Sequence, residues 1–545
     1  MSREDDRRIE TQLLPGASRR PVAAVPGLSF RCGPGRVELA ASGTVTAVLH
    51  DSAPEVSYLD SAGELRVAVD GAPLAWSSPA VSVDADEVEV TRSGGLLRLV
   101  VRHTFGDGWG LRVALTNEGP DVLTLDDPVL TWRVPPDRPA WALAAGAAGS
   151  YAVLPPAGVG PVLGGVLRLG ALTDADADGL HLGPVRLEPG GRYVVAWQWD
   201  FVATPRSFER GRHPDVPRRL DLLVDEVAAI AAGEDEALVT TPGLDAETVR
   251  EGVELSALEP GSYGVELRSA RGVTAYELRV GAPLETVLAQ TAATLLDRPR
   301  TASGVVPLPD VAAALVVQRA LAAGGLADPV TAEEALDLVA ARLPEDGPRD
   351  GTTLAFLCGE HSRTGDPEPL DQASRAVLAA AQPVPGLGLA ATELCLALLL
   401  AGRSVAPVLD HLVRLARAAG SRGPSGSLTD QAALLELAVV TMARPASEGL
   451  PRDADAVAAR VAGLGDWLGA GLKGRAVSPL PVDQVAHLAA VLALLPEPVS
   501  AALGHRWGCT AHELARRGQA EVLCRWPDAP AASALAWLVL GSRPG

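Results

Sequence analysis

The chain has 545 residues, 47% of them hydrophobic and 21% charged, so it is long enough for several domains and apolar enough to bury large cores. Its formal net charge of −20 argues against nucleic acid or an anionic membrane as the main partner. The single lysine, Lys473, lies in a context that fits neither a P-loop nor a kinase strand, which excludes phosphoryl transfer by those two routes.

The cationic residues form no basic stripe. Arginine pairs occur at 19–20, 218–219 and 516–517, but they are scattered along the chain and nothing in the sequence connects them. The five cysteines contain no C-x-x-C spacing and do not resemble a disulfide framework. The N-terminus is charged and lacks an apolar signal region, and the longest apolar stretch contains Glu393. We therefore expect a cytoplasmic protein with no membrane association.

The sequence divides into four regions. Residues 1–20 are expected to form a flexible tail. Residues 21–219 alternate apolar and polar side chains in short runs separated by Gly, Pro and Asn turns, which predicts an antiparallel β-sandwich domain. At about 200 residues, this region requires either one large sandwich or two smaller ones.

Residues 220–283 are predicted to contain a linker helix and a small module. The helix is expected at 219–233, where apolar and charged residues recur with helical spacing. The patterns Pro-Gly-x-Tyr at 260–263 and Gly-x-Thr-x-Tyr at 272–276 then resemble the final hairpin of small bacterial immunoglobulin-like modules. That resemblance implies a β-sandwich module and no activity.

Residues 284–545 are predicted to be all helical. Runs of about 12 to 18 residues are joined by short Gly and Pro loops, and Thr331 with Glu334 predicts a capping box at one helix start. Nearly all-apolar helices alternate with amphipathic ones, which suits a toroid of inner and outer helices, the α/α arrangement. An irregular helical solenoid is the competing interpretation.

A thiol and an imidazole lie three positions apart in the stretch Thr352–Arg363. On a helix, Cys358 and His361 would share a face with Leu354 and Leu357. Buried free cysteine usually behaves as a small hydrophobic side chain, so we expect core packing here rather than a Cys–His nucleophile.

Isolated ionisable residues occur inside the apolar helices. If these helices surround a polar lumen, Glu393 and Glu436 would act as acid and base, with Glu360 and His487 nearby and Arg319 available to bind substrate. The alternative interpretation is that Arg319 and neighbouring groups pair with these side chains and hold the helices in register.

Two groups of residues suggest a divalent metal, although no cofactor is the simpler expectation. His505, Cys509 and His512 would lie on one stripe of a continuous helix, a spacing that could hold a transition metal but matches no established motif. The residues Asp174, Asp176 and Asp178 match the first half of a calcium loop, but Val185 occupies the position of the final glutamate. An acidic turn in a β-hairpin is the simpler interpretation of the second group.

Aromatic residues in the predicted sandwich suggest a sugar-binding surface. Trp197 and Trp199 share one strand face and are expected in the core. The Gly-Asp-Gly loop containing Asp107 precedes Trp109, and this loop is the better candidate for a substrate-binding tip.

The predicted order of sandwich, linker and toroid is similar to the layout of several glycoside hydrolases and sugar phosphorylases. This resemblance implies a carbohydrate-active or carbohydrate-binding protein, with or without catalytic activity, whose partner is a carbohydrate. Two other functions remain open: a non-catalytic scaffold that docks another protein, and a metal-dependent activity at the His/Cys cluster.

Overall fold

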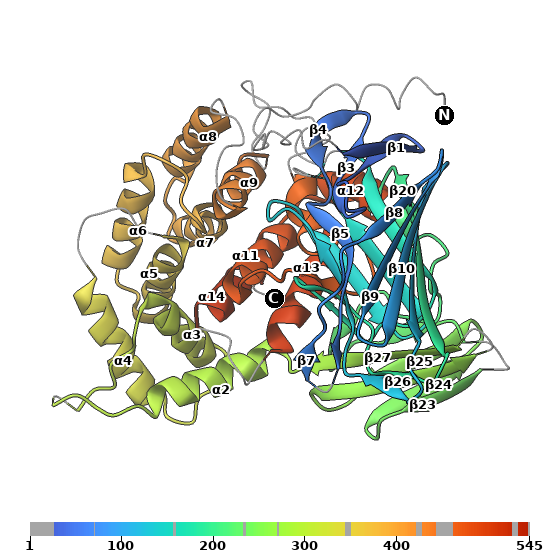
Figure 1. Cartoon of the computed structure of the whole chain (residues 1–545). Helices are drawn as coiled ribbons and strands as arrows, with labels where there is room; N and C mark the ends of the chain where they lie inside the picture. The colour runs from blue at the N-terminus through green and yellow to red at the C-terminus, as the bar shows by residue number, and fades with distance from the viewer. Residues whose placement is uncertain are drawn as a thin grey trace.

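The computed structural model describes residues 27–69, 71–155, 158, 160–232, 236–269, 272–302, 304–343, 350–420, 428–442, 461–525 and 532–542. The predicted tail at 1–20 lies outside these residues. A β-rich half and a helical half lie side by side, and a small β module lies beneath the larger β domain in the view of Figure 1. The fold is therefore a mixed β and α multidomain architecture, as predicted.

Two large antiparallel sheets face each other in the N-terminal domain. The first has the order β1-β2-β3-β5-β13-β18-β17, with β4 beside β3, and the second has the order β28-β14-β15-β16-β20-β11-β10-β9-β8. The strands of the first sheet are β1 (Leu28–Cys32), β2 (Gly35–Leu39), β3 (Val45–His50), β4 (Ala53–Ser57), β5 (Ser61–Arg66), β13 (Val129–Arg133), β17 (Asp174–Asp176) and β18 (Gly179–His181). Those of the second sheet are β8 (Ala80–Val83), β9 (Glu87–Gly94), β10 (Leu97–Phe105), β11 (Trp109–Asn117), β14 (Ala140–Ala145), β15 (Ala148–Val153), β16 (Val162–Leu169), β20 (Arg192–Val202) and β28 (Arg475–Ala476).

A short sheet of β6 (Ala68–Val69), β7 (Ala72–Pro73), β12 (Leu123–Leu125) and β19 (Val185–Leu187) and a one-turn helix, α1 (Pro205–Glu209), complete this domain. Alternate residues of the long strands are buried, as in β10, where every second side chain points into the core. The alternation visible in the sequence thus predicts which face of each strand is covered.

The core of the sandwich holds stacked aromatic rings. Trp199 stacks with Trp132 at a centroid distance of 4.4 Å and with Trp109 at 5.8 Å. His103 continues the stack, and its Nδ1 accepts a hydrogen bond of 3.2 Å from Trp109 Nε1. Burial lowers the pKa of His103 to about 4, so this imidazole is neutral at physiological pH.

The small module has an immunoglobulin-like sandwich form. Its four-stranded sheet has the order β21-β27-β26-β23 and its three-stranded sheet the order β22-β25-β24. The strands are β21 (Asp221–Leu223), β22 (Ala228–Ile230), β23 (Ala237–Thr240), β24 (Leu244–Val249), β25 (Gly252–Ala257), β26 (Gly261–Ser269) and β27 (Gly272–Gly281). The predicted hairpin is β26–β27.

The linker helix predicted at 219–233 is wrong. The segment instead supplies β21, which pairs in parallel with β27, and β22, which pairs with β25. Leu220 and Leu222 enter the core of the module, and the Asp221 carboxylate pairs with Arg279 at 2.6 Å. Tertiary pairing and burial here outweigh a helical pattern that is only local.

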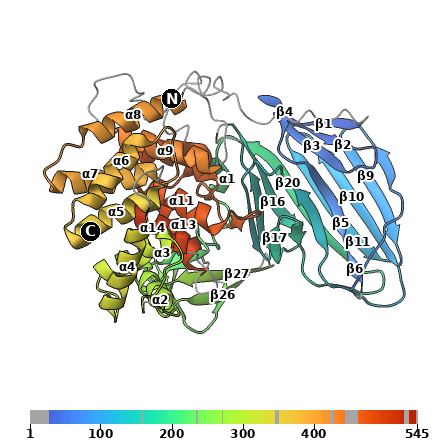
Figure 2. The same cartoon turned by 90° about the vertical axis from the view of Figure 1, so that its left-hand side faces the viewer.

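The C-terminal half is helical. Its helices are α2 (Leu284–Leu296), α3 (Val311–Ala322), α4 (Pro329–Arg342), α5 (Gly351–Thr364), α6 (Glu368–Ala379), α7 (Leu387–Leu400), α8 (Ala406–Gly420), α9 (Leu428–Met442), α11 (Val482–Ala493), α12 (Glu497–Trp507), α13 (Ala511–Leu523) and α14 (Ala532–Gly541). The sequence also predicts a helix at 453–469, and its first part, residues 453–460, lies outside the described residues. Among those described, α3, α5, α7, α9, α11 and α14 contact one another in a closed ring, with α2, α4, α6, α8 and α13 outside it. Figure 2 shows the helices gathered beside the sandwich.

Contacts among the described residues also cross this ring. The nearly all-apolar α14 also touches α5 and α7, and the Trp537 ring stacks on His487 at 4.3 Å. The capping box predicted at Thr331 is wrong, because α4 begins earlier and Asp328 caps it. None of the described helices is long and apolar enough to cross a membrane alone; α11 and α12 meet that criterion only when counted together across a 119° bend.

The two halves share a β-strand. β28, from the helical half, pairs with β14 at the edge of the second sheet, with Trp141 opposite Ala476. The preceding loop carries Lys473, whose Nζ donates to the carbonyls of Arg212 and His213. Trp141 also donates its Nε1–H to the Asp466 carbonyl at 3.1 Å. We call residues 469–476 the junction loop and strand.

We predict that Gly474→Ala destabilises the protein more than Gly324→Ala. Both glycines have positive φ, 90° and 70°, but a Cβ at Gly474 would lie 2.0 Å from the Ala142 carbonyl oxygen, whereas a Cβ at Gly324 meets no atom within 4 Å. We expect a loss of about 3 kcal/mol for the first and about 1 kcal/mol for the second in denaturant unfolding. Equal losses would contradict the tight packing inferred for the junction strand.

We also predict a pH dependence that originates at His103. The folded protein keeps this imidazole neutral while the unfolded chain protonates near its ordinary pKa, so stability is present above pH 6.5 and is lost as pH falls toward 4. Between pH 7 and pH 5 the loss should be about 2 kcal/mol. The measurement is the free energy of unfolding at both pH values. His103→Gln should show a smaller difference than the native chain, and an unchanged difference would contradict the assignment.

Candidate functional site

Glu436 is a structural residue inside the helical ring. It lies on α9, where its carboxylate accepts hydrogen bonds of 3.0 Å from the backbone N–H groups of Gly386 and Gly388 at the start of α7. It also pairs with His487 Nε2 on α11. Glu436 is 2% exposed and His487 3% exposed. The pair therefore ties three helices together and faces no solvent.

Glu393 pairs with an arginine and not with a histidine. It lies on α7 and pairs with Arg319 on α3 at 2.5 Å. Burial raises the pKa of Glu393, and the neighbouring Arg319 cation opposes that rise. The two carboxylates therefore have different partners, a guanidinium for Glu393 and an imidazole for Glu436.

Glu360 is also fully engaged. It accepts from Gln318 Nε2 at 2.7 Å and pairs with Arg363 at 2.5 Å. Of the predicted acid–base group, the structure brings Glu436 and His487 together, whereas Glu393 and Glu360 each pair with an arginine. The alternative, in which such residues pair and hold the helices in register, describes their observed contacts, and Arg319 pairs with Glu393.

Cys358 and His361, in the stretch Thr352–Arg363, also have structural roles. Cys358 is 3% exposed, and burial raises the pKa of its thiol far above the ordinary value. His361 Nδ1 bonds to the Asp366 carbonyl at 2.7 Å instead of approaching the thiol. No Cys–His nucleophile is assembled on α5.

The predicted sugar platform in the sandwich is not available at the surface. Trp109 is 1% exposed and belongs to the aromatic stack, as do Trp197 and Trp199, which were expected in the core. Asp107 is exposed in the turn before β11. A ligand at this turn would meet a carboxylate but no aromatic face of Trp109.

The acidic loop forms the β17–β18 hairpin. Asp176 accepts hydrogen bonds from the backbone N–H groups of Asp178 and Gly179, and lies 3.3 Å from His181 Nε2. Asp174 and Asp178 are exposed. These contacts match the interpretation as an acidic turn. Nowhere in the part of the chain that the structure describes do three or more His, Cys, Asp or Glu side chains converge as a metal ion requires.

The predicted stripe of His505, Cys509 and His512 does not exist, because the helix is interrupted. α12 ends at Gly508 with φ of 73°, and α13 starts after Thr510, which forms a capping box with Glu513. His505 therefore lies on a different helix from His512. A metal at these residues stays a prediction without geometric support.

A cavity of about 170 Å³ nevertheless lies beside two of these residues. It lies where the segment entering the small module meets the junction loop and the start of α13. We call it the junction pocket. Its lining residues are Arg218, Arg219, Glu226, Gly471, Cys509, His512, Glu513, Leu514, Arg516 and Arg517.

The junction pocket combines several arginines with an accessible imidazole. Arg218 donates to the Gly508 carbonyl at 2.7 Å, and Arg219 pairs with Glu226 at 3.0 Å. His512 is exposed and has no hydrogen-bond partner among the described residues. Burial raises the pKa of Cys509 to about 12, so its thiol is protonated at neutral pH in the metal-free protein.

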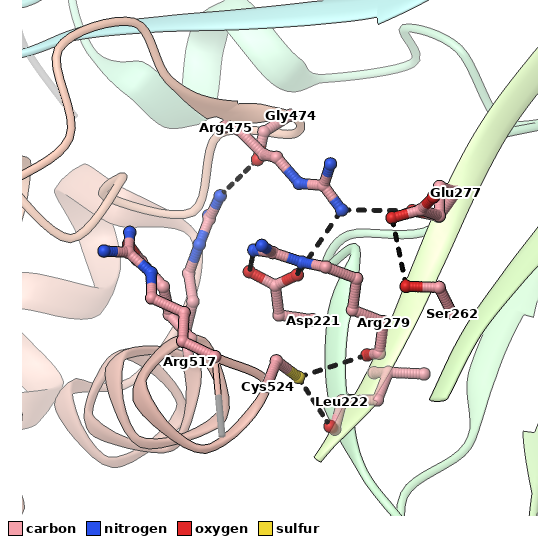
Figure 3. Close-up of polar contacts among 11 residues, drawn as sticks. Asp221, Leu222, Ser262, Glu277, Arg279, Gly474, Arg475, Arg517 and Cys524 are labelled. Carbon is pink, nitrogen blue, oxygen red and sulfur yellow. Dashed lines mark hydrogen bonds and ion pairs between the residues drawn. The ribbon is translucent and has the colours of Figure 1, made fainter. Parts of the chain in front are cut away.

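The wall behind the pocket is built from buried polar contacts. Arg517 donates to the carbonyls of Leu472 and Gly474 and lies over the Trp141 ring at 4.3 Å. Figure 3 shows this arginine beside the ion pair of Asp221 with Arg279 and the Arg475 guanidinium. This network fixes α13 against β27 and so holds the pocket in shape.

Sequence reasoning missed the arginines of this site. The pairs at 218–219 and 516–517 are visible in the sequence, but no local pattern places them together. The tertiary structure brings both pairs to one cavity. Two residues chosen for another reason, Cys509 and His512, also line it.

The structure joins a β-sandwich through a small β module to an α/α helical ring. A polysaccharide lyase of known structure shares this fold. Neither a protein-family model nor a curated protein matches the sequence. Among solved structures, a polysaccharide lyase aligns with a TM-score of 0.65 and 12% sequence identity, covering 90% of this chain and 92% of the lyase. That similarity shows a common fold.

Two further solved structures align only loosely. A TPR-domain containing protein from Parabacteroides distasonis has a TM-score of 0.20 and 11% identity over 84% of this chain and 88% of its own. A glycoside hydrolase family 81 enzyme from Clostridium thermocellum has a TM-score of 0.18 and 9% identity over 96% of this chain and 88% of its own. Neither score indicates a shared fold.

We predict that Glu436→Ala destabilises the protein by about 3–5 kcal/mol, because it leaves a buried imidazole and backbone N–H groups without their acceptor. Glu393→Ala removes an ion pair that is partly exposed, at 31% and 22% for the two side chains, and should cost about 1 kcal/mol. Chemical denaturation of both variants measures the difference. A larger loss for Glu393→Ala would contradict the structural roles assigned here.

Proposed function

We propose that the protein recognises a carbohydrate and that the junction pocket holds the sugar. The observation that carries this proposal is the fold shared with a polysaccharide lyase over nearly the whole length of both chains. Fold similarity alone does not assign a site, so the proposal also depends on the pocket itself.

The position and chemistry of the junction pocket support a binding role. Ligand sites occur preferentially where domains meet, and this cavity is lined by the start of the small module, the junction loop and α13. Guanidinium and imidazole groups offer many hydrogen-bond donors for sugar hydroxyl oxygens. Leu514 adds an apolar side chain to the wall.

A two-carboxylate glycosidase mechanism at Glu393 and Glu436 has no geometric support, because each of them is held by its own partners. Within the pocket, His512 carries an imidazole, a group that can both accept and donate a proton. We therefore propose His512 as the reactive group in any conversion of the bound sugar. Docking of another protein and metal-dependent activity stay as predictions of the sequence.

The proposal is tested by comparing His512→Ala with His505→Ala. Both histidines are exposed and lie on neighbouring helices, but only His512 lines the junction pocket. We expect native protein and His505→Ala to retain the same glycan on a polysaccharide array, and His512→Ala to bind it about tenfold more weakly. Product analysis by chromatography would detect cleavage.

Two outcomes would contradict this proposal. One is the absence of binding to any polysaccharide by the native chain. The other is an equal effect of the two histidine substitutions, which would place the binding site elsewhere.

A further inference from the structure

We infer that the group held in the junction pocket is an anion, a carboxylate or a sulfate, carried by a single sugar unit. This inference rests on the proposed function and specifies the ligand of the same site. It follows from the balance of charge around the cavity, from two guanidinium groups with unsatisfied capacity, and from the size of the cavity.

The balance of charge around the pocket is opposite to that of the whole molecule. Four arginines and two carboxylates, those of Glu226 and Glu513, line the cavity, whereas the complete chain carries a formal charge of −20. Local excess of one charge in a recess concentrates ligands of the other sign. The two carboxylates are occupied by the protein itself: Glu226 pairs with Arg219 and Arg516, and Glu513 caps α13.

Arg517 carries a buried charge that no direct ion pair compensates among the described residues, although the Glu521 and Asp221 carboxylates act on it from farther away. It is 7% exposed, and its hydrogen bonds go to the carbonyl oxygens of Leu472 and Gly474. Of the carboxylates that the structure describes, none forms an ion pair with it within 4 Å. An anionic ligand in the pocket would add a direct partner for this buried cation.

Arg218 and Arg219 provide donors for such a ligand. Arg218 is exposed and uses one nitrogen for the Gly508 carbonyl, which leaves the rest of its planar fork free. Arg219 Nη1 is buried and has no hydrogen-bond partner, although the same side chain pairs with Glu226 through Nη2. Guanidinium groups bind carboxylates and sulfate-like oxyanions through paired hydrogen bonds, so both side chains match the inferred ligand.

The size of the pocket limits the ligand to one unit. The cavity measures about 170 Å³, well below the roughly 300–1,000 Å³ of sites that enclose drug-sized molecules. It accommodates one sugar ring or its charged substituent. Neighbouring units of a longer chain would extend outside the cavity.

The experiment measures binding to the full-length protein by calorimetry, with glucuronic acid, its methyl ester, glucose 6-sulfate and glucose as probes. The acid and its ester differ in the charge of one group. We expect the acid or the sulfate to bind at least tenfold more tightly than glucose and the ester. Added salt should weaken binding of the acidic probes alone, because the interaction is between charges.

Substitutions locate the effect. Arg218→Gln and Arg219→Gln should each weaken binding of the acidic probe about fivefold or more, while Arg186→Gln, an exposed arginine on β19, should leave it unchanged. Circular dichroism verifies that each variant is folded. Arg218→Gln replaces an exposed side chain, so at least one variant should retain the native structure.

The possible outcomes separate the inference of an anionic ligand from the proposed binding of a carbohydrate. Equal affinity for the acid and its ester, no binding of either acidic probe, or full affinity in both arginine variants overturns the inference of an anionic ligand. If neutral saccharides still bind and His512→Ala weakens them, the proposed function stands while this inference falls. If no saccharide of any charge binds, both fall.

Discussion

The junction loop and strand hold the molecule together as one unit. A sheet edge in the sandwich is completed by β28, which comes from the helical half more than 300 positions later in the chain than β14. The loop before it turns through left-handed backbone at Gly469, Ala470, Gly471 and Gly474. Its carbonyls are bound by Arg517, whose guanidinium covers Trp141. The geometry of the pocket depends on this contact, because Gly471 and Arg517 both belong to its wall.

Features with a repeated local pattern could be predicted from the sequence. Alternating residues in β10 and β11 gave the buried faces of the sandwich, and the apolar stretches at α7 and α14 gave buried helices. The strands β21 and β22 could not be predicted, because residues 219–233 follow a helical pattern. Pairing with β27 and β25 decides their conformation instead. The end of α12 at Gly508 was also missed, because the surrounding residues follow helical spacing. A glycine followed two residues later by a threonine is nevertheless typical of one helix ending and another beginning.

The residues of the candidate site could not be predicted from the sequence for a different reason. Lone acids in apolar helices drew attention to Glu393 and Glu436, yet both are satisfied by partners that only the folded chain supplies. Conversely, the arginines at 218–219 and 516–517 look like ordinary surface residues in the sequence. What distinguishes them is a shared cavity, a buried cation and an unused donor, and these are properties of tertiary structure. His512 was found by its residue type, although the metal chemistry assigned to it had assumed a continuous helix.

The single lysine of the chain, Lys473, has a structural role. Lys473 Nζ lies against two backbone carbonyls between the halves of the molecule, and burial lowers its pKa. Every other cationic side chain, apart from histidine, is an arginine, whose guanidinium does not lose its proton in water at any pH a cell encounters. The positive electrostatic features of this molecule are therefore permanent. Acylating enzymes and amine-reactive reagents have almost no side-chain target here, so modification of lysine is not a means by which a cell could tune its charge.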